Sequence, residues 1–356
     1  MKASFQKYQL KFKNPVLTSR GSMSYKNGYY IFLEHNGVTG VGECSYIEGL
    51  SIDRIDQIEA ILNEAFEDIE DIFEVYCLHE FLPDYFAEYP AAAFGLETAI
   101  LDLKYGGKHL TSYNADFYNG LKSIPINGLV WMGSDAFMQQ QIEQKLAEGF
   151  RCIKVKVGAI DFKEECRLIE NIRKNYSPDQ IEIRLDANGG FNESNVRERL
   201  RILSQYTIHS IEQPIKPQQY LLIHELCAEN IIPIALDEEL IGIRGIDIPY
   251  KLLETIRPQY IILKPSLLGG LYMCDDWVNF AEKLGIQWWA TSALESNIGL
   301  NAIAQWASAK LLKRGVNTVQ GLGTGSLYEN NVKSPLYIEA GQLKYAVGGS
   351  WGDRLR

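Results

Sequence analysis

The sequence predicts an α/β protein whose larger part is a TIM-like (β/α) barrel, with a smaller α+β capping domain beside it. The length of 356 residues fits a barrel of roughly 200 to 250 residues plus a small partner. From about Ile124 onward, short apolar runs alternate with helical stretches, which favours parallel strands with crossover helices. Eight such runs can be counted, and a closed barrel requires eight strands.

The predicted barrel occupies residues 121–325. Its candidate strands are IPINGLV from Ile124, IKVKV from Ile153, IEIRLD from Ile181, IHSIE from Ile208, IPIALD from Ile232, YIILK from Tyr260, IQWWAT from Ile286 and VNTVQ from Val316. Each is short and apolar, as strands buried on both faces should be.

Residues 1–120 have a different pattern and predict the capping domain. An alternating run at 29–34 precedes an Asn36-Gly37 hairpin signal and a second short strand near Val41. Residues 52–72 and 91–103 repeat apolar side chains at helical spacing.

The tail also predicts structure. Residues 336–345 suggest a hairpin with Gly341 in its turn. We therefore expect residues 326–356 to return to the first module and complete the capping domain.

Composition excludes several classes of protein. A content of 46% hydrophobic and 22% charged residues is typical of a globular chain. The net charge of −10 argues against a nucleic-acid partner, which needs a clustered basic surface. No apolar stretch approaches the roughly 20 residues of a membrane span, and the amino terminus lacks the apolar run of a signal peptide. We expect a cytoplasmic protein with a small-molecule partner, and the sequence indicates no particular oligomeric state.

Six scattered cysteines without a CxxC pair suggest neither a zinc site nor a disulfide framework. Free thiols are the expected state.

Charged residues stand at the ends of successive candidate strands. They are Lys154, Lys156, Asp186, Glu212, Asp237 and Lys264. Their spacing of about 25 to 32 residues is close to one βα unit, so they should converge on one rim of the barrel. Three carboxylates form an all-oxygen ligand set, which suits Mg²⁺ or Mn²⁺ better than zinc.

The lysines predict proton chemistry beside this metal. Lys154 and Lys156 lie two apart on a strand and share a face, while Lys264 approaches from the opposite side. A lysine near two other cations should have its pKa lowered by about 3 units, which makes it a usable general base. A base beside a metal-bound carboxylate favours removal of the neighbouring proton. The alternative is that the lysines simply pair with the acids.

These motifs resemble the enolase superfamily. The matching segments are KVKVG at 154–158, DANGGF from Asp186, EQP from Glu212, DEE from Asp237 and KPS from Lys264. The lysines resemble the muconate-lactonising subgroup, because the seventh strand offers no histidine base. His209, the only strand histidine, should point away from Glu212 and lie under a helix.

Within the subgroup the chain is most similar to the o-succinylbenzoate synthase family. This rests on GECSYIEGLS near Gly42, FGLETAILDL from Phe94, TSALESNIG from Thr291 and GLGTG from Gly321. The resemblance implies a magnesium-dependent hydro-lyase of menaquinone synthesis, which dehydrates 2-succinyl-6-hydroxy-2,4-cyclohexadiene-1-carboxylate to 2-succinylbenzoate.

The resemblance also assigns roles to residues. Asp186, Glu212 and Asp237 would hold Mg²⁺, with Mn²⁺ as a possible substitute, and Asn188 and Glu238 would support them.

The three lysines would carry the chemistry. Lys156 would take the proton and return it to the departing hydroxide, Lys264 would stabilise the enediolate, and Lys154 would help to lower the pKa of the base.

Substrate contacts are expected at the rim. Ser292 and the turn at Gly321 and Gly323 could bind the succinyl carboxylate, because a glycine-rich turn exposes backbone N–H groups. Arg184 should face inward and either orient a ligand or pair with a carboxylate. Residues 22–27 resemble a mobile capping loop from which Tyr25 could touch substrate.

Other readings remain open. An N-acylamino-acid racemase or dipeptide epimerase of the same subgroup could use the same two lysines. Strand eight has Gln320 where dipeptide epimerases carry an Asp-x-Asp that grips the substrate ammonium, which weakens only the dipeptide reading. A Schiff-base aldolase and a non-catalytic barrel are more distant alternatives. GLGTG is not a spaced GxGxxG motif, so no nicotinamide cofactor is expected.

Overall fold

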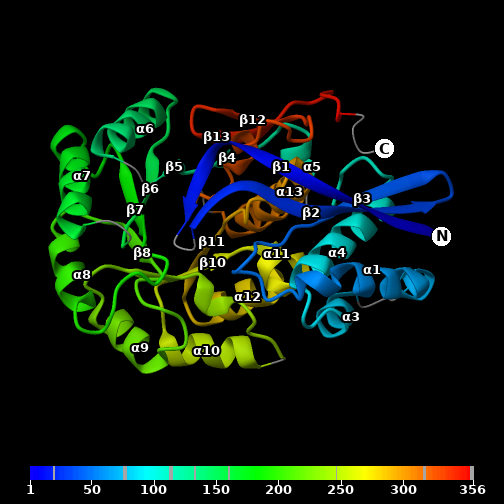
Figure 1. Cartoon of the computed structure of the whole chain (residues 1–356), viewed down its shortest axis with the longest axis horizontal. Helices are drawn as coiled ribbons and strands as arrows, with labels where there is room; N and C mark the ends of the chain where they lie inside the picture. Colours follow the sequence, from blue (N-terminus) through cyan, green and yellow to red (C-terminus); the bar gives the residue numbers. More distant parts are fainter. Residues whose placement is uncertain are drawn as a thin grey trace.

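The computed structural model describes residues 1–18, 21–74, 78–111, 115–131, 134–158, 161–245, 247–315 and 318–352. It has two parts, a barrel ringed by helices and an antiparallel sheet with its own helices (Figure 1). Within the described residues, no helix has the length and hydropathy needed to cross a membrane.

The smaller part combines a three-stranded antiparallel sheet with helices. The sheet consists of β1 (Lys2–Thr18), β2 (Gly21–His35) and β3 (Val38–Cys44) in that order. The helices are α1 (Ile58–Glu67), α2 (Ile69–Glu74), α3 (Leu78–Tyr85), α4 (Pro90–Lys104) and α5 (Ala115–Tyr118), with a 3₁₀ turn η1 (Ile55–Gln57) before α1.

The predictions for this smaller part are confirmed in some places and wrong in others. The predicted turn joins β2 to β3, with positive φ at both Asn36 and Gly37. The predicted helix at 52–72 is wrong in detail, because Asp68 interrupts it between α1 and α2. The long strand β1 was not predicted, although its apolar residues alternate.

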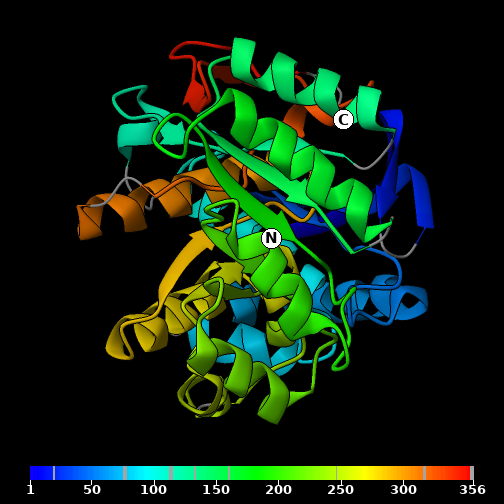
Figure 2. The ribbon, with the colours of Figure 1, turned by 90° about the vertical axis from the view of Figure 1, so that its left-hand side faces the viewer.

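The larger part is a parallel barrel. Its strands are β5 (Gly128–Val130), β6 (Cys152–Lys156), β7 (Glu182–Asp186), β8 (Ser210–Glu212), β9 (Ile234–Leu236), β10 (Tyr260–Leu263) and β11 (Gln287–Ala290), which pair in chain order. The helices are α6 (Asp135–Ala147), α7 (Phe162–Asn175), α8 (Val196–Ser204), α9 (Tyr220–Glu229), α10 (Ile248–Ile256), α11 (Pro265–Leu268), α12 (Leu271–Lys283) and α13 (Asn297–Arg314), with 3₁₀ turns η2 (Glu238–Leu240) and η3 (Thr324–Leu327). Figure 2 shows α6 to α8 lying outside the strands.

The eighth strand is reduced to single bridges. Residues 316 and 317 of the predicted strand lie outside the described residues. Gln320 bridges Ile126 and Gly321 bridges Thr291, both in parallel orientation. The Asn127 N–H donates to the Gln320 carbonyl at 3.0 Å, so this segment joins the first and last strands and closes the barrel.

The predicted tail hairpin is present as β12 (Leu336–Glu339) and β13 (Gln342–Tyr345). Its partner is β4 (Ile124–Pro125), at the start of the barrel, instead of the β1–β3 sheet. Nearby residues do reach that sheet, because the Glu329 N–H donates to the Lys11 carbonyl at 2.9 Å. The domain boundaries at 120 and 326 stay a prediction.

Buried carboxylates of the smaller part bind the amino ends of barrel helices. Glu97 of α4 accepts from the N–H groups of Leu271 and Tyr272, at 2.6 and 2.9 Å, where α12 begins. Glu43 of β3 accepts from the N–H groups of Ser296 and Gly299 at the start of α13. The first N–H groups of a helix lack partners within it and favour negative charge. These contacts hold the smaller part over the rim of the barrel.

Close packing within the smaller part requires glycine. A Cβ at Gly42 would lie 2.0 Å from the Gly95 carbonyl oxygen. Strand β3 therefore approaches α4 as closely as it does only without a side chain there.

Burial of Glu97 predicts a pH effect on stability. Burial raises its pKa to about 8, whereas an unfolded glutamate has a pKa of about 4.3. Between these values the folded state holds the extra proton, so the free energy of unfolding should fall with rising pH, by up to about 1.4 kcal/mol per unit. Denaturant titrations from pH 5 to 8 should show a smaller fall for Glu97→Gln than for wild type. Equal slopes would contradict the assignment.

Candidate active site

Three strands place charged residues in one row across the sheet. Lys156 pairs with Asp186, which pairs with Glu212, so all three stand at the same level. Asp237 and Lys264 directly follow β9 and β10. Strand order puts three strands between β6 and β10, so Lys156 and Lys264 approach from opposite sides of the barrel. The structure thus brings together the residues whose convergence the spacing predicted.

The lysines and acids contact one another directly. The Lys154 ammonium lies 2.8 Å from Asp186 Oδ2 and 2.6 Å from Glu212 Oε2. The Lys156 ammonium lies 2.9 Å from the same Asp186 oxygen, and Lys264 donates to Asp237. In this structure the lysines pair with the acids and neutralise them. This is the simple pairing that the sequence left open as the alternative to a lysine base.

The pKa expectation for the lysine cluster is wrong at two of its members. Burial alone would lower the pKa of Lys154, but Asp186 and Glu212 outweigh it, and the pKa is raised. The pKa of Lys264 is likewise raised, because Asp237 and Glu212 outweigh burial. At both Lys154 and Lys264 the neighbouring charges with the largest effect on the pKa are carboxylates and not other cations.

An asparagine orients the Lys156 side chain. Asn188 Oδ1 accepts from the Lys156 ammonium at 2.6 Å, and Asn188 Nδ2 donates to Glu238 Oε1 at 2.9 Å. The amide therefore has one orientation only. Its backbone is left-handed, with φ 42°, a conformation that asparagine tolerates better than most residues.

The acids fit a divalent cation by chemistry. Burial and the Asp186 charge raise the pKa of Glu212, while burial and Asp237 raise that of Glu238. One oxygen of each, Glu212 Oε1 and Glu238 Oε2, is buried without a hydrogen-bond partner. Oxygen ligands of this kind suit Mg²⁺. Among the described residues, however, no group of three His, Cys, Asp or Glu side chains is arranged to hold a metal. In this arrangement lysine ammonium groups contact Asp186, Glu212 and Asp237.

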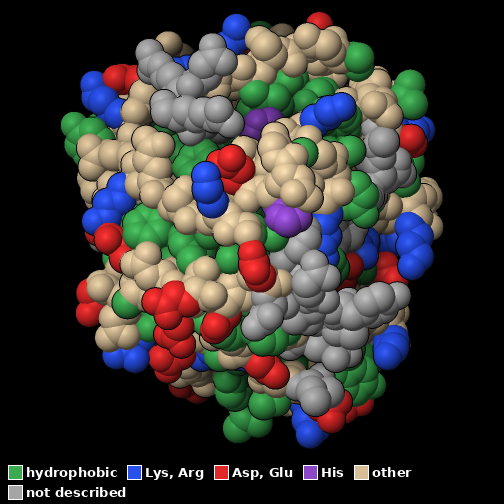
Figure 3. Space-filling model, turned by 90° about the vertical axis from the view of Figure 1, so that its right-hand side faces the viewer, with side chains coloured by type: hydrophobic (Ala, Val, Ile, Leu, Met, Phe, Trp, Pro, Cys, Tyr) green, Lys and Arg blue, Asp and Glu red, His purple; other side chains and the backbone are tan. Residues whose placement is uncertain are grey.

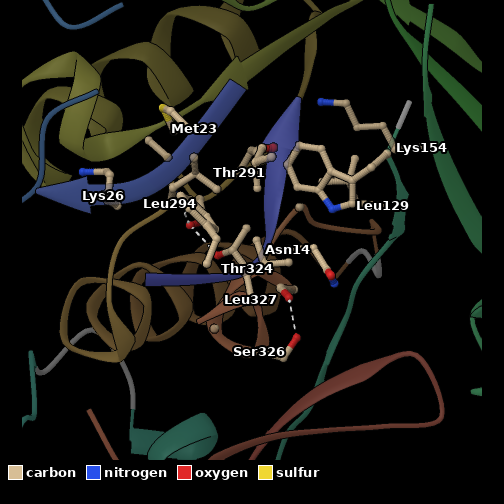
Figure 4. A pocket seen from close by; sticks show the side chains of 18 of the residues that line it. Asn14, Met23, Lys26, Leu129, Lys154, Thr291, Leu294, Thr324, Ser326 and Leu327 are labelled. Carbon is tan, nitrogen blue, oxygen red and sulfur yellow. Dashed lines mark hydrogen bonds between the residues drawn. The ribbon is translucent and has the colours of Figure 1, made fainter. Parts of the chain in front are cut away.

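A cavity of about 1340 Å³ opens above these residues, between the barrel rim and the smaller part. The three lysines, Asp186, Asn188 and Glu238 line it, together with residues of β2, the segment that follows β11 and the 321–327 segment. In Figure 4, Lys154 and Lys26 lie on opposite sides of the view, with Thr291 and Thr324 between them.

The face of the smaller part in Figure 3 mixes basic and acidic side chains. The absence of a nucleic-acid partner stays a prediction.

Ser292 lines this cavity but its hydroxyl is fully engaged. It donates to Glu295 and accepts from Thr324 Oγ1 at 2.7 Å and from the Leu294 N–H at 3.1 Å. A serine has one donor and two acceptor positions, so none is left for a substrate carboxylate. The expected role of Ser292 is corrected to that of a support. Glu295 is only three residues along the chain from Ser292, but this spacing alone does not show that the two side chains bond.

The two glycines expected to bind substrate, Gly321 and Gly323, have different surroundings. The Gly321 N–H donates to the Ala290 carbonyl at 2.8 Å, so Gly321 serves barrel closure and has no N–H to offer a ligand. Gly323 lines the cavity, and its contact with substrate stays a prediction.

Arg184 faces inward, as expected, but below the cavity. Its guanidinium donates to Glu182 Oε1 at 2.7 Å and to the Val319 carbonyl at 2.9 Å, and lies 4.2 Å from the Trp289 ring centre. It does not line the cavity, so of its two expected roles the pairing with a carboxylate is the one observed.

His209 also differs from expectation. Its ring packs against that of Tyr260, tilted by 36° with centroids 5.0 Å apart, and its Nε2 lies 3.8 Å from Glu182 Oε2. It therefore shares the partner Glu182 with Arg184, and a position under a helix stays a prediction.

Residues 22–27 form strand and not a loop. Tyr25 pairs with Lys11 across the β1–β2 ladder. It is 49% exposed and lines the cavity, so a substrate contact stays a prediction.

Two residues of the site were missed as candidates. Gln213 and Glu239 are buried beside the metal-ligand candidates and hydrogen-bond to each other at 3.0 Å. The signal was present, because they are the second and third letters of the EQP and DEE motifs.

Removing Lys154 should unbalance the buried acids. Lys154→Met leaves Asp186 and Glu212 without their shared cation, which typically costs about 3–5 kcal/mol. In EDTA, Lys154→Met should therefore unfold at a much lower temperature than wild type, and Mg²⁺ should restore part of the lost stability. The control Lys174→Met removes an exposed lysine paired with Glu170 at 2.9 Å, and should change stability by less than about 1 kcal/mol. Equal effects of both variants would contradict a charge-balanced cluster.

Comparisons with known proteins agree with this geometry. Residues 137–347 match the model of the enolase C-terminal domain-like family. The o-succinylbenzoate synthase of Desulfotalea psychrophila is 45% identical over 96% of this chain and 98% of its own length. The crystal structure of MenC from that organism has a TM-score of 0.85 at 43% identity, covering 97% of this chain and 99% of that one. A dipeptide epimerase from Enterococcus faecalis shares the fold, with a TM-score of 0.82 at 20% identity over 99% and 98% of the two chains. The chain belongs to the o-succinylbenzoate synthase family, within the muconate-lactonising subgroup of the enolase superfamily.

Proposed function

We propose that this protein dehydrates 2-succinyl-6-hydroxy-2,4-cyclohexadiene-1-carboxylate to 2-succinylbenzoate in menaquinone synthesis, in the cytoplasm and with Mg²⁺ or Mn²⁺. The observation that supports this reaction is the placement of Lys156 and Lys264 on opposite sides of a carboxylate cluster, at the floor of the cavity between the barrel and the smaller part. Family membership carries the choice of substrate.

Asp186, Glu212 and Asp237 would hold the cation. Bound there, Mg²⁺ would bind the substrate carboxylate and stabilise the negative charge that develops on it. Asn188 and Glu238 lie beside these ligands and would keep them in place.

Lys156 is the proposed base. In its neutral form, Nζ takes the proton from the ring carbon that bears the carboxylate, and the carbon–hydrogen electron pair moves towards the carboxylate to give the enediolate. The neighbouring carbon–oxygen bond then breaks, and the same ammonium returns the proton to the departing hydroxide, which leaves as water. One lysine serves both steps if proton and hydroxide leave from the same face, and the ring becomes aromatic.

Lys264 and Lys154 have supporting roles in this proposal. Lys264 places a positive charge across the ring from Lys156. Lys154 binds Asp186 and Glu212 from below and holds them in position. The distal carboxylate would bind backbone N–H groups near Gly323.

The second candidate is racemisation of N-acylamino acids. Two lysines on opposite strands could remove a proton from one face of a carbon and return it to the other. A dipeptide substrate is disfavoured because the side-chain amide of Gln320 is fully buried. It accepts from the Ala290 N–H and donates to the Thr318 carbonyl. No acidic group stands at that position to bind a substrate ammonium.

The metal requirement can be measured first. Purified protein with Mg²⁺ should convert the cyclohexadiene carboxylate to 2-succinylbenzoate, followed by absorbance, and EDTA should abolish the rate. Added Mg²⁺ should restore it. If no turnover is seen, N-succinyl amino acids should be assayed next, and racemisation of these would favour the second candidate.

Lys156→Ala should lower kcat by at least about 10³-fold, within the range for a lost general acid–base group. The circular dichroism spectrum should be unchanged. Lys145→Ala is the matched control, because Lys145 also lines the cavity but pairs with Glu148 at 2.7 Å, and its kcat should stay within about twofold. A near-normal rate for Lys156→Ala would refute the base assignment.

A further inference from the structure

We propose that Gln213 is a positioning residue that sets the spacing of the three carboxylates, with Glu239 as its partner. It rests on the proposed function only in that Asp186, Glu212 and Asp237 bind a divalent cation. Gln213 has no contact with the cavity, and it acts through the backbone of its neighbours.

The Gln213 side chain is fully buried and its amide is fully used. Nε2 donates to the Ile215 carbonyl and to Glu239 Oε2, both at 3.0 Å. Oε1 accepts from the N–H groups of Asp237 and Glu239, both at 3.2 Å. Two donors and two acceptors are the whole capacity of an amide, so its orientation is fixed. By accepting from the Asp237 N–H, Gln213 Oε1 fixes the backbone of a proposed metal ligand.

The Gln213 backbone extends this hold to the neighbouring strands. Its N–H donates to the Ala235 carbonyl at 2.9 Å, and its carbonyl accepts from the Gly189 N–H at 2.7 Å. Gly189 directly follows Asn188, in the turn after Asp186. One residue thus bonds the ends of β7 and β9 while sitting next to Glu212 on β8.

The local conformation supports a specific role. Gln213 has a φ of 40°, in the left-handed region that few non-glycine residues adopt without a compensating gain. The four side-chain bonds supply that compensation. A residue without both a donor and an acceptor could not keep them.

Glu239 completes the arrangement. Oε2 accepts from Gln213, and Oε1 accepts from the Gln218 N–H at 2.7 Å. Its carboxylate therefore fixes the amide nitrogen of Gln213 on one side and the following turn on the other. The pair bridges the EQP and DEE motifs.

A buried glutamine elsewhere in the chain provides the control. Gln305 on α13 is also fully buried, donates to the His109 carbonyl at 2.8 Å and accepts from the Thr111 N–H at 3.0 Å. It lies outside the carboxylate cluster. Leucine at either position removes a comparable set of buried hydrogen bonds, so both variants should unfold at lower temperature.

The test is binding of Mn²⁺ alone to the metal-free, full-length protein, measured by calorimetry. Gln213→Leu should weaken Mn²⁺ binding by at least about 10-fold, as loss of a partner behind metal ligands typically does. Gln305→Leu should stay within about twofold of wild type. Folded Gln213→Leu that binds Mn²⁺ as tightly as wild type would overturn this inference and leave the proposed function intact. Absence of Mn²⁺ binding by wild type would overturn both.

An exchange of donor and acceptor keeps the inference testable if Gln213→Leu does not fold. Both carboxylate oxygens of Glu239 accept, from Gln213 Nε2 and from the Gln218 N–H. In Glu239→Gln the new NH₂ group must face one of these two donors, so Mn²⁺ binding should weaken. The double variant Gln213→Glu with Glu239→Gln restores the bond between positions 213 and 239 with its direction reversed and keeps the net charge, but leaves the Ile215 carbonyl without its donor. Its Mn²⁺ affinity should therefore be higher than that of Glu239→Gln and lower than that of wild type. A double variant no tighter than Glu239→Gln would overturn the positioning role.

Discussion

Burial of four carboxyl groups at one end of the barrel is the constraint on which the rest of the site depends. Asp186, Glu212, Asp237 and Glu238 are each at most 8% exposed. Isolated buried charges are strongly destabilising, so they persist only with partners. Three lysine ammonium groups contact Asp186, Glu212 and Asp237, and the Asn188 amide donates to Glu238. The four acids outnumber the three lysines by one, and Glu212 Oε1 and Glu238 Oε2 accept no hydrogen bond. A divalent cation would neutralise that excess negative charge.

The smaller part uses carboxylates in another way. Glu43 and Glu97 are as deeply buried, but both accept from backbone N–H groups at helix ends, and Glu43 accepts from the Tyr8 and Ser296 hydroxyls as well. Those N–H groups cannot leave, because they belong to the barrel helices. Lysine side chains can move aside for a ligand. The same chemical group therefore fixes the cap over the barrel in one place and remains available for binding in the other.

The sequence predicted what depends on repeated spacing. One charged residue per βα unit placed Lys156, Asp186 and Glu212 at a common rim, because parallel strands end at the same edge. It did not predict which neighbouring side chains would bond to one another. Glu295, three residues after Ser292, takes the only hydroxyl proton of that serine, and Glu182, two residues before Arg184 on β7, binds its guanidinium. Spacing permits both contacts but does not fix the side-chain orientations that make them, so a residue on the correct face was given a role that its neighbours had already filled.

The two chemistries open to this family differ in what the lysines must do. Racemisation needs Lys156 and Lys264 to act as equals on opposite faces of one carbon. Dehydration needs one base and a stabilising charge, and aromatisation then makes the product much more stable than the substrate. In this chain the two lysines differ in their partners: Lys156 donates to the Asn188 amide as well as to Asp186, whereas the hydrogen bond of Lys264 goes to Asp237. An unequal pair suits a one-way elimination better than an exchange that must run equally well from both sides.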